Sequence, residues 1–527
     1  MLINNWLKST TTLAAAAVFV AAGVQPASAQ EVLLKSSDGT ISVNGQLQSF
    51  EDGHYTIQTV LGSMRIAALN IICEGEACPD LSSGVEDVVV AGSDTLGDGL
   101  MPLLISGFAA QNGGITESVE QSGAISVTNL VGEGGFGDPI GTFSVSSTSS
   151  ADAFAALQDK NTQIGMSSRR ILPAEARRLR DVGGGNMIDL KQEHVVAVDS
   201  LSVVVNHQNP IGTISLADVD RIYSGLVTNW SELGGPNQPI TVFGRASDTG
   251  SRAVFDSRIF SESGRSVSDA VVEKATDQEI AAAVNADPYA IGYVGFANVR
   301  GTKPVNVAGN CGISSHPDSF SSKTEEYPLQ RRLYLYNRGD NLTDTAQNFI
   351  DYATSENADG VVAKSGFINL GVERVTQDTS NDRMQLLIEN TTDPFEFGLM
   401  RDLLVDMFRW DRLSTTFRFA SGSNQLDGKA ILDLERLVTY LKQHPEGTEV
   451  SFVGFTDSDG VFEANRNLSI ARAQQVSATV QELVATQLPG VTFSFKGFGE
   501  LAPTSCNDTL EGKRINRRVE VWIRKPV

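Results

Sequence analysis

Three short turns rich in serine and threonine each precede a predicted helix, at 92–96, 147–150 and 245–251. A helix N-terminus has unbonded N–H groups and carries about half a positive charge, so three that meet at one point would bind an oxyanion. Arg245 would add a charge-assisted hydrogen bond. Any one turn is equally well explained as a helix cap, because serine and threonine are favoured there. Their joint presence in one region predicts an anion-binding site.

A second set of polar residues lies near the C-terminus. Asp457 and Asp459 follow a predicted strand, and Arg472 lies on the predicted helix that comes next. An aspartate and an arginine can together hold a ligand that carries both an ammonium and a carboxylate group. A polar turn and a solvated helix face would show the same residues. The pattern of a calcium-binding loop is not completed, so we expect no metal there.

The sequence contains no motif that indicates catalysis. A G-x-G-x-x-G string at 132–137 is followed by Asp138 and Pro139 and not by a helical pattern, which predicts a loop and no dinucleotide site. There is no nucleophile elbow, P-loop or histidine-based triad. A phosphatase would need a metal cluster or an activated nucleophile. We therefore expect binding without chemistry and no cofactor.

The first 29 residues have the pattern of a secretory signal peptide. An apolar run at 13–24 is followed by Ala27 and Ala29, which form an A-x-A cleavage site. A membrane anchor is the alternative, but the run falls short of the ~20 residues that span a bilayer. Residue 30 is glutamine, so cleavage after Ala29 would leave no cysteine for lipid attachment. These features predict an exported, soluble protein.

Export bears on the four cysteines. Cys73 and Cys78 are close enough for a local loop, and an oxidising compartment favours a disulfide over free thiols. Zinc is the alternative, but the five histidines form no cluster with ligand spacing. Cys311 and Cys506 have no local partner, and the sequence leaves their state open.

The elements that must position these residues change along the chain. Alternating polar and apolar residues predict a small all-β module at the start, and strands alternating with helices predict an α/β architecture from Val88 onward. Phe397, Met400, Leu404 and Phe408 recur at helical spacing and predict a packed connecting helix. The predicted parts are a signal peptide (1–29), a small β module with the Cys73/Cys78 loop (30–84), a two-lobed α/β domain (86–372), a helical connector (373–412) and an α+β domain of order βαβαββ (413–527).

The charge balance excludes some partners. The chain has 41 basic and 63 acidic side chains among 527 residues, for a formal net charge of −22. This charge disfavours nucleic acid and anionic membrane surfaces. No stretch after the signal peptide is apolar enough to span a membrane.

The α/β region resembles the periplasmic phosphate-binding proteins of bacterial ABC importers. The likeness rests on GMSSR at 165–169, VVVNHQNP at 203–210, IYSGLVTNWS at 222–231, RASDTGS at 245–251 and AIGYV at 290–294. It implies two α/β lobes joined by crossing strands, with the ligand between them. The family positions for phosphate are matched by Thr95, Leu96, Ser150, Ser168, Arg245, Thr249, Gly250 and Ser251.

The resemblance has one departure that concerns specificity. Ser168 and Ser247 stand where strict phosphate binders have carboxylates, which accept the proton of phosphate and exclude sulfate. Asp94 or Asp248 is the candidate substitute. Phosphate is the predicted ligand, with related tetrahedral oxyanions as the alternative.

The C-terminal region resembles the OmpA-like peptidoglycan-binding family. The residues that carry the likeness are GFTDSDG at 454–460, Asn465, Leu468, Ser469, Arg472, Ala473 and NRRVE at 516–520. The resemblance implies that Asp457 pairs with the ammonium of diaminopimelate in the stem peptide and that Arg472 binds its carboxylate. Thr456 and Asn465 match positions that orient the ligand, and Arg518 or its neighbour Arg517 supports the site.

Taken together, the sequence predicts a non-enzymatic phosphate-binding protein anchored to peptidoglycan in a Gram-negative periplasm, near the outer membrane. An ABC permease is the expected partner for phosphate capture. The alternative is a structural or surface-interaction protein of the cell envelope whose binding lobes have been repurposed.

Overall fold

The computed structural model describes residues 31–524 apart from 37–40, 52–53, 68–70, 76, 79–85, 133–138, 248, 378–386, 388–393, 419–427, 445–446, 485–487 and 489. The predicted signal peptide, most of the glycine-rich loop and Asp248 lie outside these residues. The chain forms two compact units, Met1–Ser82 with Gly135–Asp138 and Ser83–Gly134 with Pro139–Val527.

The first unit contains a five-stranded sheet of order β4-β3-β2-β1-β5. Alternate residues of its strands point inward, so that Val32, Leu34, Tyr55 and Ile57 form a small core. A disulfide joins Cys73 to Cys78, as their spacing predicts. The strands are β1 (Glu31–Ser36), β2 (Ser42–Glu51), β3 (His54–Thr59), β4 (Gly62–Ala67) and β5 (Ile71–Glu74).

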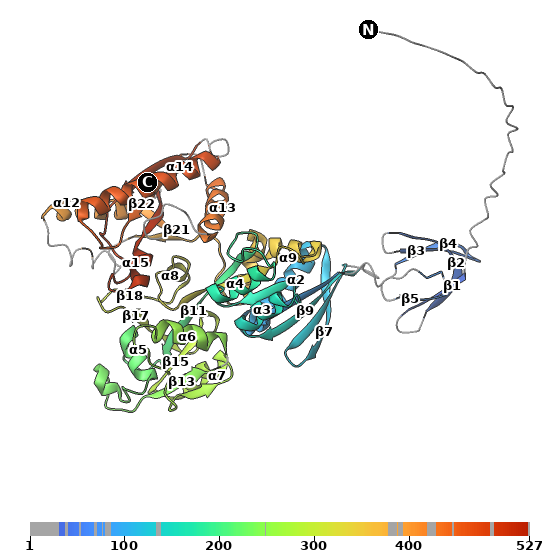
Figure 1. Cartoon of the computed structure of the whole chain (residues 1–527), viewed down its shortest axis with the longest axis horizontal. Coiled ribbons are helices and arrows are strands. Elements are labelled where there is room, and N and C mark those ends of the chain that lie inside the picture. Colours follow the sequence, from blue (N-terminus) through green and yellow to red (C-terminus); the bar gives the residue numbers. More distant parts are fainter. Residues whose placement is uncertain are drawn as a thin grey trace, which may run out of the picture. The chain divides into compact units, whose positions relative to one another are not determined.

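The second unit begins with a mixed sheet whose long strand β11 (Glu193–Val205) crosses between two lobes (Figure 1). Its valine-rich run is buried along most of its length, which is typical of a strand covered on both faces. Residues 193–200 pair with β19 (Gln330–Asn337), and 201–205 pair with β15 (Ala290–Gly295). β11 therefore joins the two lobes by pairing with β19 in one part of its length and with β15 in the other.

Each lobe has a separate hydrophobic core. The first lobe contains β6 (Asp87–Ser93), β7 (Gly114–Ser122), β8 (Ile125–Gly132), β9 (Pro139–Thr148) and β10 (Ile164–Ser167) with α1 (Asp94–Gly99), α2 (Met101–Gln111), α3 (Ser150–Gln158), α4 (Pro173–Asp181), α9 (Asp344–Thr354) and α10 (Asp359–Lys364). The second lobe contains β12 (Thr213–Ser215), β13 (Thr241–Arg245), β14 (Val272–Lys274), β16 (Lys303–Pro304), β17 (Asn306–Ala308) and β18 (Ser314–Ser315) with α5 (Leu216–Tyr223), α6 (Gly250–Ile259), α7 (Asp277–Ala286) and α8 (Ser319–Lys323).

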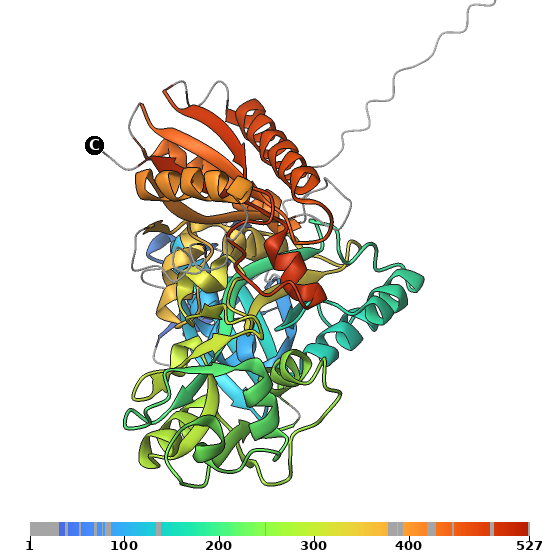
Figure 2. The ribbon, with the colours of Figure 1, turned by 90° about the vertical axis from the view of Figure 1, so that its left-hand side faces the viewer.

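The C-terminal sheet has order β20-β21-β24-β22-β23 and carries helices on both faces (Figure 2). Strand alternation produces the two faces, because Val450 and Phe452 contact one helical layer while Val453 and Phe455 contact the other. The elements are β20 (Arg374–Thr376), α12 (Pro394–Arg409), β21 (Trp410–Arg418), α13 (Gly428–Lys442), β22 (Glu449–Phe455), α14 (Phe462–Val484), β23 (Thr492–Gly497), α15 (Leu510–Asn516) and β24 (Arg518–Arg524).

Two details of this region differ from the sequence prediction. Helix α12 begins at Pro394 as its residues indicate, but its buried side chains are Met400, Leu403 and Met407. The helical spacing placed Phe397 and Phe408 in the core, but Phe397 is 58% exposed and Phe408 is 50% exposed. The short helix α15 lies between the last two strands, where the sequence predicted none.

The lobes and the C-terminal sheet are linked by a covalent bond and by buried charges. A disulfide joins Cys311 to Cys506. Glu325 is surrounded by Arg332 of the lobes and by Arg418 and Arg514 of the C-terminal part. Burial alone raises the pKa of Glu325, but the three arginines outweigh it and hold that pKa well below its ordinary value. The carboxylate is therefore ionised at this junction.

Candidate functional site

In the hydroxyl-rich turn at 147–150, two neighbouring serines have different roles. Ser149 caps α3, since its Oγ accepts from the backbone N–H of Asp152 in a capping box. The neighbouring Ser150 is therefore not needed as a cap, and its Oγ lies 3.2 Å from the Oγ of Ser168. The backbone N–H of Ser168 also donates to Ser150 Oγ at 3.0 Å. This contact brings the start of α3 to the end of β10.

Gly250 is the point at which the lobes meet. A Cβ atom on Gly250 would lie 2.7 Å from Ser168 Oγ, 3.6 Å from Ser93 Oγ and 3.7 Å from Asp94 Oδ1. The backbone at the start of α6 therefore faces the ends of β6 and β10 and the start of α1 across the gap between the lobes. The absence of a side chain at Gly250 allows this close approach between the two lobes.

Arg245 ends β13 and its guanidinium is held from two sides. Its Nη1 donates to Asp277 Oδ1 at 2.7 Å, and its Nη2 lies 3.6 Å from Asp94 Oδ2. The backbone N–H of Arg245 donates to the hydroxyl of Tyr293, and burial raises the pKa of that tyrosine. These contacts fix the fork in position before any ligand arrives, and they lower the entropy that binding must overcome.

The remaining predicted residues hold the backbone in place. Thr249 caps α6, because its Oγ1 accepts from the N–H of Arg252 and donates to the carbonyl of Ala246. The N–H of Thr95 donates to Asp94 Oδ1 at 2.7 Å. Leu96 is fully buried, so only its backbone can face a ligand.

A residue that the sequence did not indicate completes the site. Arg331, on the crossing strand β19, donates to Ser251 Oγ at 3.0 Å and pairs with Asp199 at 2.7 Å. Its side chain is only 4% exposed. Asp277, which orients Arg245, was missed in the same way. No local signal could have found either, since each comes from an element distant in the chain from the residue it contacts.

The arrangement suits an anion. Among the described residues, the buried Ser93 Oγ and Arg245 Nε have no hydrogen-bond partner. Ser93 Oγ lies 3.6 Å from the Gly250 Cβ position, and Arg245 lies beside Asp94. Buried polar groups in native proteins are normally bonded, so unpaired ones at a polar point indicate where a ligand would bind. Asp94 supplies a carboxylate oxygen 3.7 Å from the Gly250 Cβ position. It can accept the proton of a protonated oxyanion.

The C-terminal candidate site lies between β22 and α14. Asp457 and Arg517 form an ion pair of 2.6 Å, and Arg472 is buried close by. Burial and then the charge of Arg517 lower the pKa of Arg472. Asn465 donates to the carbonyl of Asp457 at 3.3 Å, and the buried Oγ1 of Thr456 has no partner among the described residues.

Arg518 does not lie with this group. Its side chain is fully buried, pairs with Glu520 at 2.7 Å and donates to the carbonyl of Ala502. Its guanidinium also lies over the ring of Phe455. The structure therefore brings Arg517 to Asp457 and assigns Arg518 to the core of the sheet. Arg517 follows α15 and Arg518 begins β24, and the sequence does not say which of the two arginines faces the ligand.

Comparison with known families now identifies the larger domain. A family model of the PBP superfamily domain matches residues 81–357, which is more than half of the chain. The chain belongs to the PBP superfamily. A model of the OmpA family matches residues 418–517. The candidate oxyanion site thus lies in the PBP domain and the Asp457 group in the OmpA domain.

Three individual relatives illustrate the similarity. The phosphate-binding protein PstS of Bacillus subtilis is 29% identical over 36% of this chain and 61% of its own length. PstS of Pseudomonas aeruginosa is 26% identical over 43% and 73%. The probable lipoprotein YiaD of Escherichia coli is 35% identical over 22% of this chain and 46% of its own length. The chain thus spans less than two thirds of the Bacillus subtilis relative.

A solved structure of an ABC-type phosphate transport receptor from Vibrio cholerae is 22% identical, covers 53% of this chain and 99% of its own, and has a TM-score of 0.42. Within the part of the chain that the structure describes, no helix is both long and apolar enough to cross a bilayer.

Proposed function

We propose that this protein binds phosphate, or a similar tetrahedral oxyanion, at the Gly250 site, where the start of α6 meets the first lobe of the PBP domain, and that it catalyses no reaction. One observation carries the proposal: the start of α6 meets Ser168, Asp94 and the hydroxyl of Ser93, which bonds no described residue. Relatives named phosphate-binding proteins support the same ligand. The gathering of these hydroxyls supports binding over the alternative of a structural envelope protein with repurposed lobes.

Isothermal titration with inorganic phosphate tests this function. Arg245→Ala removes the guanidinium and leaves Asp94 and Asp277 without their cation, so we expect affinity to fall by at least about tenfold, since a charge-assisted bond is worth about 1.5–3 kcal/mol. Arg300→Ala, an exposed arginine of the same lobe, is the matched control. No measurable binding by the wild-type protein, or equal binding by Arg245→Ala, would refute the proposal.

Asp94 is the proposed source of selectivity. Ser168 and Ser247 cannot accept a ligand proton as a carboxylate does, whereas Asp94 lies 3.7 Å from the Gly250 Cβ position. A carboxylate there favours protonated phosphate and leaves sulfate facing an unpaired acceptor. Asp94→Asn should therefore narrow the ratio of phosphate to sulfate affinity, which competition titration measures.

We also propose that the OmpA domain tethers the protein to peptidoglycan through diaminopimelate. Asp457 would pair with the ammonium of the ligand and Arg472 with its carboxylate, while Arg517 holds Asp457 in place. A pull-down with diaminopimelate-type peptidoglycan should fail for Asp457→Ala and Arg472→Ala and succeed for Glu482→Ala, which changes an exposed residue of α14. If both variants still bind peptidoglycan, the proposed tether is refuted.

These two activities define the proposed role. A phosphate binder held to the wall of a Gram-negative periplasm would capture phosphate near the outer membrane and pass it to an ABC importer. Loss of phosphate uptake in cells that lack the protein, with recovery on expression of the wild type and not of Arg245→Ala, tests the transport step.

A further inference from the structure

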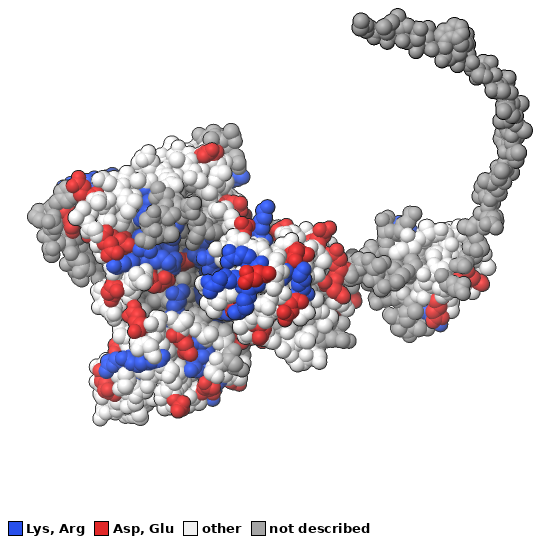
Figure 3. Space-filling view, viewed as in Figure 1, with Lys and Arg blue, Asp and Glu red and all other residues white. Residues whose placement is uncertain are grey.

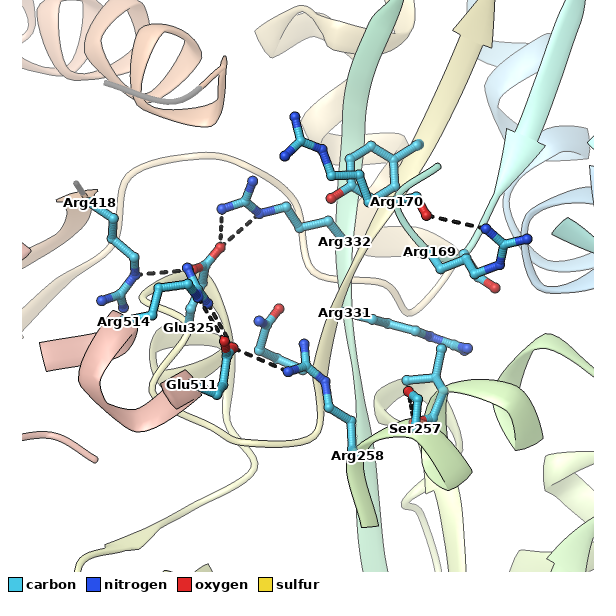
Figure 4. A pocket seen from close by; sticks show the side chains of 14 residues that line it. Arg169, Arg170, Ser257, Arg258, Glu325, Arg331, Arg332, Arg418, Glu511 and Arg514 are labelled. Atoms are coloured by element: carbon cyan, nitrogen blue, oxygen red, sulfur yellow. Dashed lines mark hydrogen bonds and ion pairs between the residues drawn. The ribbon is translucent and has the colours of Figure 1, made fainter. Parts of the chain in front are cut away.

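A cavity borders the proposed phosphate site at Ser168 and Arg331. It has a volume of about 560 Å³, and its wall comes from both lobes, the crossing strand β19 and the OmpA domain. Seven of the lining residues are arginines and two are glutamates. Figure 4 shows these side chains, which are Ser168, Arg169, Arg170, Val254, Ser257, Arg258, Glu325, Gln330, Arg331, Arg332, Tyr334, Arg418, Glu511 and Arg514.

The cavity is cationic although the chain is strongly acidic. Three of its arginines pair with carboxylates outside the lining, namely Glu175, Glu193 and Asp199. With the two lining glutamates, five carboxylates of the described residues lie close to these seven guanidinium groups. On the face drawn in Figure 3, basic side chains gather where the OmpA domain meets the lobes. Such a local excess attracts anions whatever the net charge of the chain, because distant charges are screened.

Two residues connect the cavity with the phosphate site. Ser168 lines the cavity and contacts both Ser150 and the Gly250 position. Arg331 also lines it and bonds Ser251 through Nη2, while its buried Nη1 has no partner among the described residues. Arg331 is more than nine-tenths buried, so this unpaired donor is a second observation that points to a ligand.

The far wall belongs to the OmpA domain and is held rigidly. Glu511 of α15 pairs with Arg258 of α6 at 3.1 Å and with Arg514 at 2.9 Å. Arg258 uses only Nη1 in this contact, and its other donors bond no other described residue. The Cys311–Cys506 disulfide lies in the same junction and fixes the two domains together. The cavity thus exists only in the fused chain.

We propose that this cavity binds the further phosphate groups of an oligophosphate whose terminal phosphate occupies the Gly250 site. The inference rests on the proposed phosphate site. Small-molecule sites measure roughly 300–1,000 Å³, and a single tetrahedral anion would leave most of this cavity empty. Planar arginine forks match phosphate oxygens. Val254 and Tyr334 are the apolar and aromatic residues of the lining, and the other twelve residues carry polar or charged groups.

Titration of the full mature chain with inorganic tripolyphosphate, orthophosphate and glycerol 3-phosphate tests the proposal. We expect tripolyphosphate to bind at least about tenfold more tightly than orthophosphate, with a steeper loss of affinity as salt rises. The double change Arg170→Gln and Arg258→Gln should weaken tripolyphosphate by about tenfold and leave orthophosphate unchanged. Arg265→Gln is the matched control, since Arg265 belongs to the same lobe, forms one ion pair with Asp220 and lies outside this cavity.

The outcomes separate this inference from the phosphate site itself. Equal affinity for tripolyphosphate and orthophosphate, or a double variant that binds tripolyphosphate like the wild type, overturns the oligophosphate site and leaves the phosphate site standing. Glycerol 3-phosphate that binds as tightly as tripolyphosphate also overturns it. A third outcome is that the wild-type protein binds tripolyphosphate but not orthophosphate, and that the double change weakens tripolyphosphate binding. This outcome supports the oligophosphate site and refutes the proposed orthophosphate function.

Discussion

Cys311 and Cys506 lie 195 residues apart in the sequence and are joined by a disulfide. Cys311 follows β17 in the second lobe, and Cys506 precedes α15 in the OmpA domain. The bond closes across the junction that also holds Glu325 and its three arginines. The two domains are therefore not independent modules on a flexible linker, and the junction has consequences that can be measured.

Removal of this bond should weaken the junction. A cross-link over so long a loop restricts the unfolded chain, and its loss typically costs about 2–4 kcal/mol. We expect Cys311→Ser with Cys506→Ser to lower the urea midpoint followed by tryptophan fluorescence, since Trp230, Trp410 and Trp522 are all buried in this unit. Cys73→Ser with Cys78→Ser is the control, because that disulfide belongs to the other compact unit. An unchanged midpoint in the first variant would contradict the prediction.

The stability of the junction should also depend on pH. Burial alone raises the pKa of Glu511, but Arg514 and Arg258 outweigh it and lower that pKa from 4.5 to about 2. A depressed pKa means that the ionised carboxylate stabilises the folded state, fully above pH 4.5 and progressively less as the pH falls toward 2. The same sign holds for Glu325.

Thermal melting between pH 6 and about 2 measures this effect. The wild-type melting temperature should fall in the acid range. The melting temperature of Glu511→Gln should be lower than that of the wild type at pH 6 and should change less below pH 4.5. Glu482→Gln, at an exposed position on α14, should follow the wild-type curve. Parallel curves for wild type and Glu511→Gln would show that Glu511 does not contribute.

A single methyl group should test the oxyanion site sterically. In Gly250→Ala the new Cβ would lie 2.7 Å from Ser168 Oγ, inside the space proposed for phosphate. Alanine suits a helix start, so we expect the fold to persist while phosphate affinity falls by at least about tenfold. Gly398→Ala is the control, because a Cβ there meets no atom within 4 Å. Circular dichroism confirms the fold, and unchanged phosphate affinity would exclude Gly250 from the site.

The order of strands and helices could be predicted from the sequence because it depends on local periodicity, but packing choices could not. On α12, Met400 belongs both to the predicted stripe with Phe397 and to the observed one with Leu403 and Met407. Periodicity finds such a helix without deciding which of two overlapping apolar stripes faces the sheet. Helix α15 spans only Leu510–Asn516, too short for a periodic signal.

The candidate site shows the same division. Turn residues such as Ser150 and Gly250 lie at helix starts, where composition is informative. Arg331 and Asp277 act through contacts with Ser251 and Arg245, which tertiary folding alone creates. The pairing of Cys311 with Cys506 is equally non-local.

Arg517, which precedes β24, and Arg518, its first residue, should have different roles. Arg518 is fully buried with Glu520, and removal of one partner of a buried ion pair costs about 3–5 kcal/mol, because the other charge is left unpaired. Arg518→Met should therefore lower stability in urea denaturation by that order. Arg517→Met frees Asp457 at the proposed ligand site and should mainly weaken peptidoglycan binding. A stable Arg518→Met protein that no longer binds the wall would reverse these roles and return Arg518 to the ligand site.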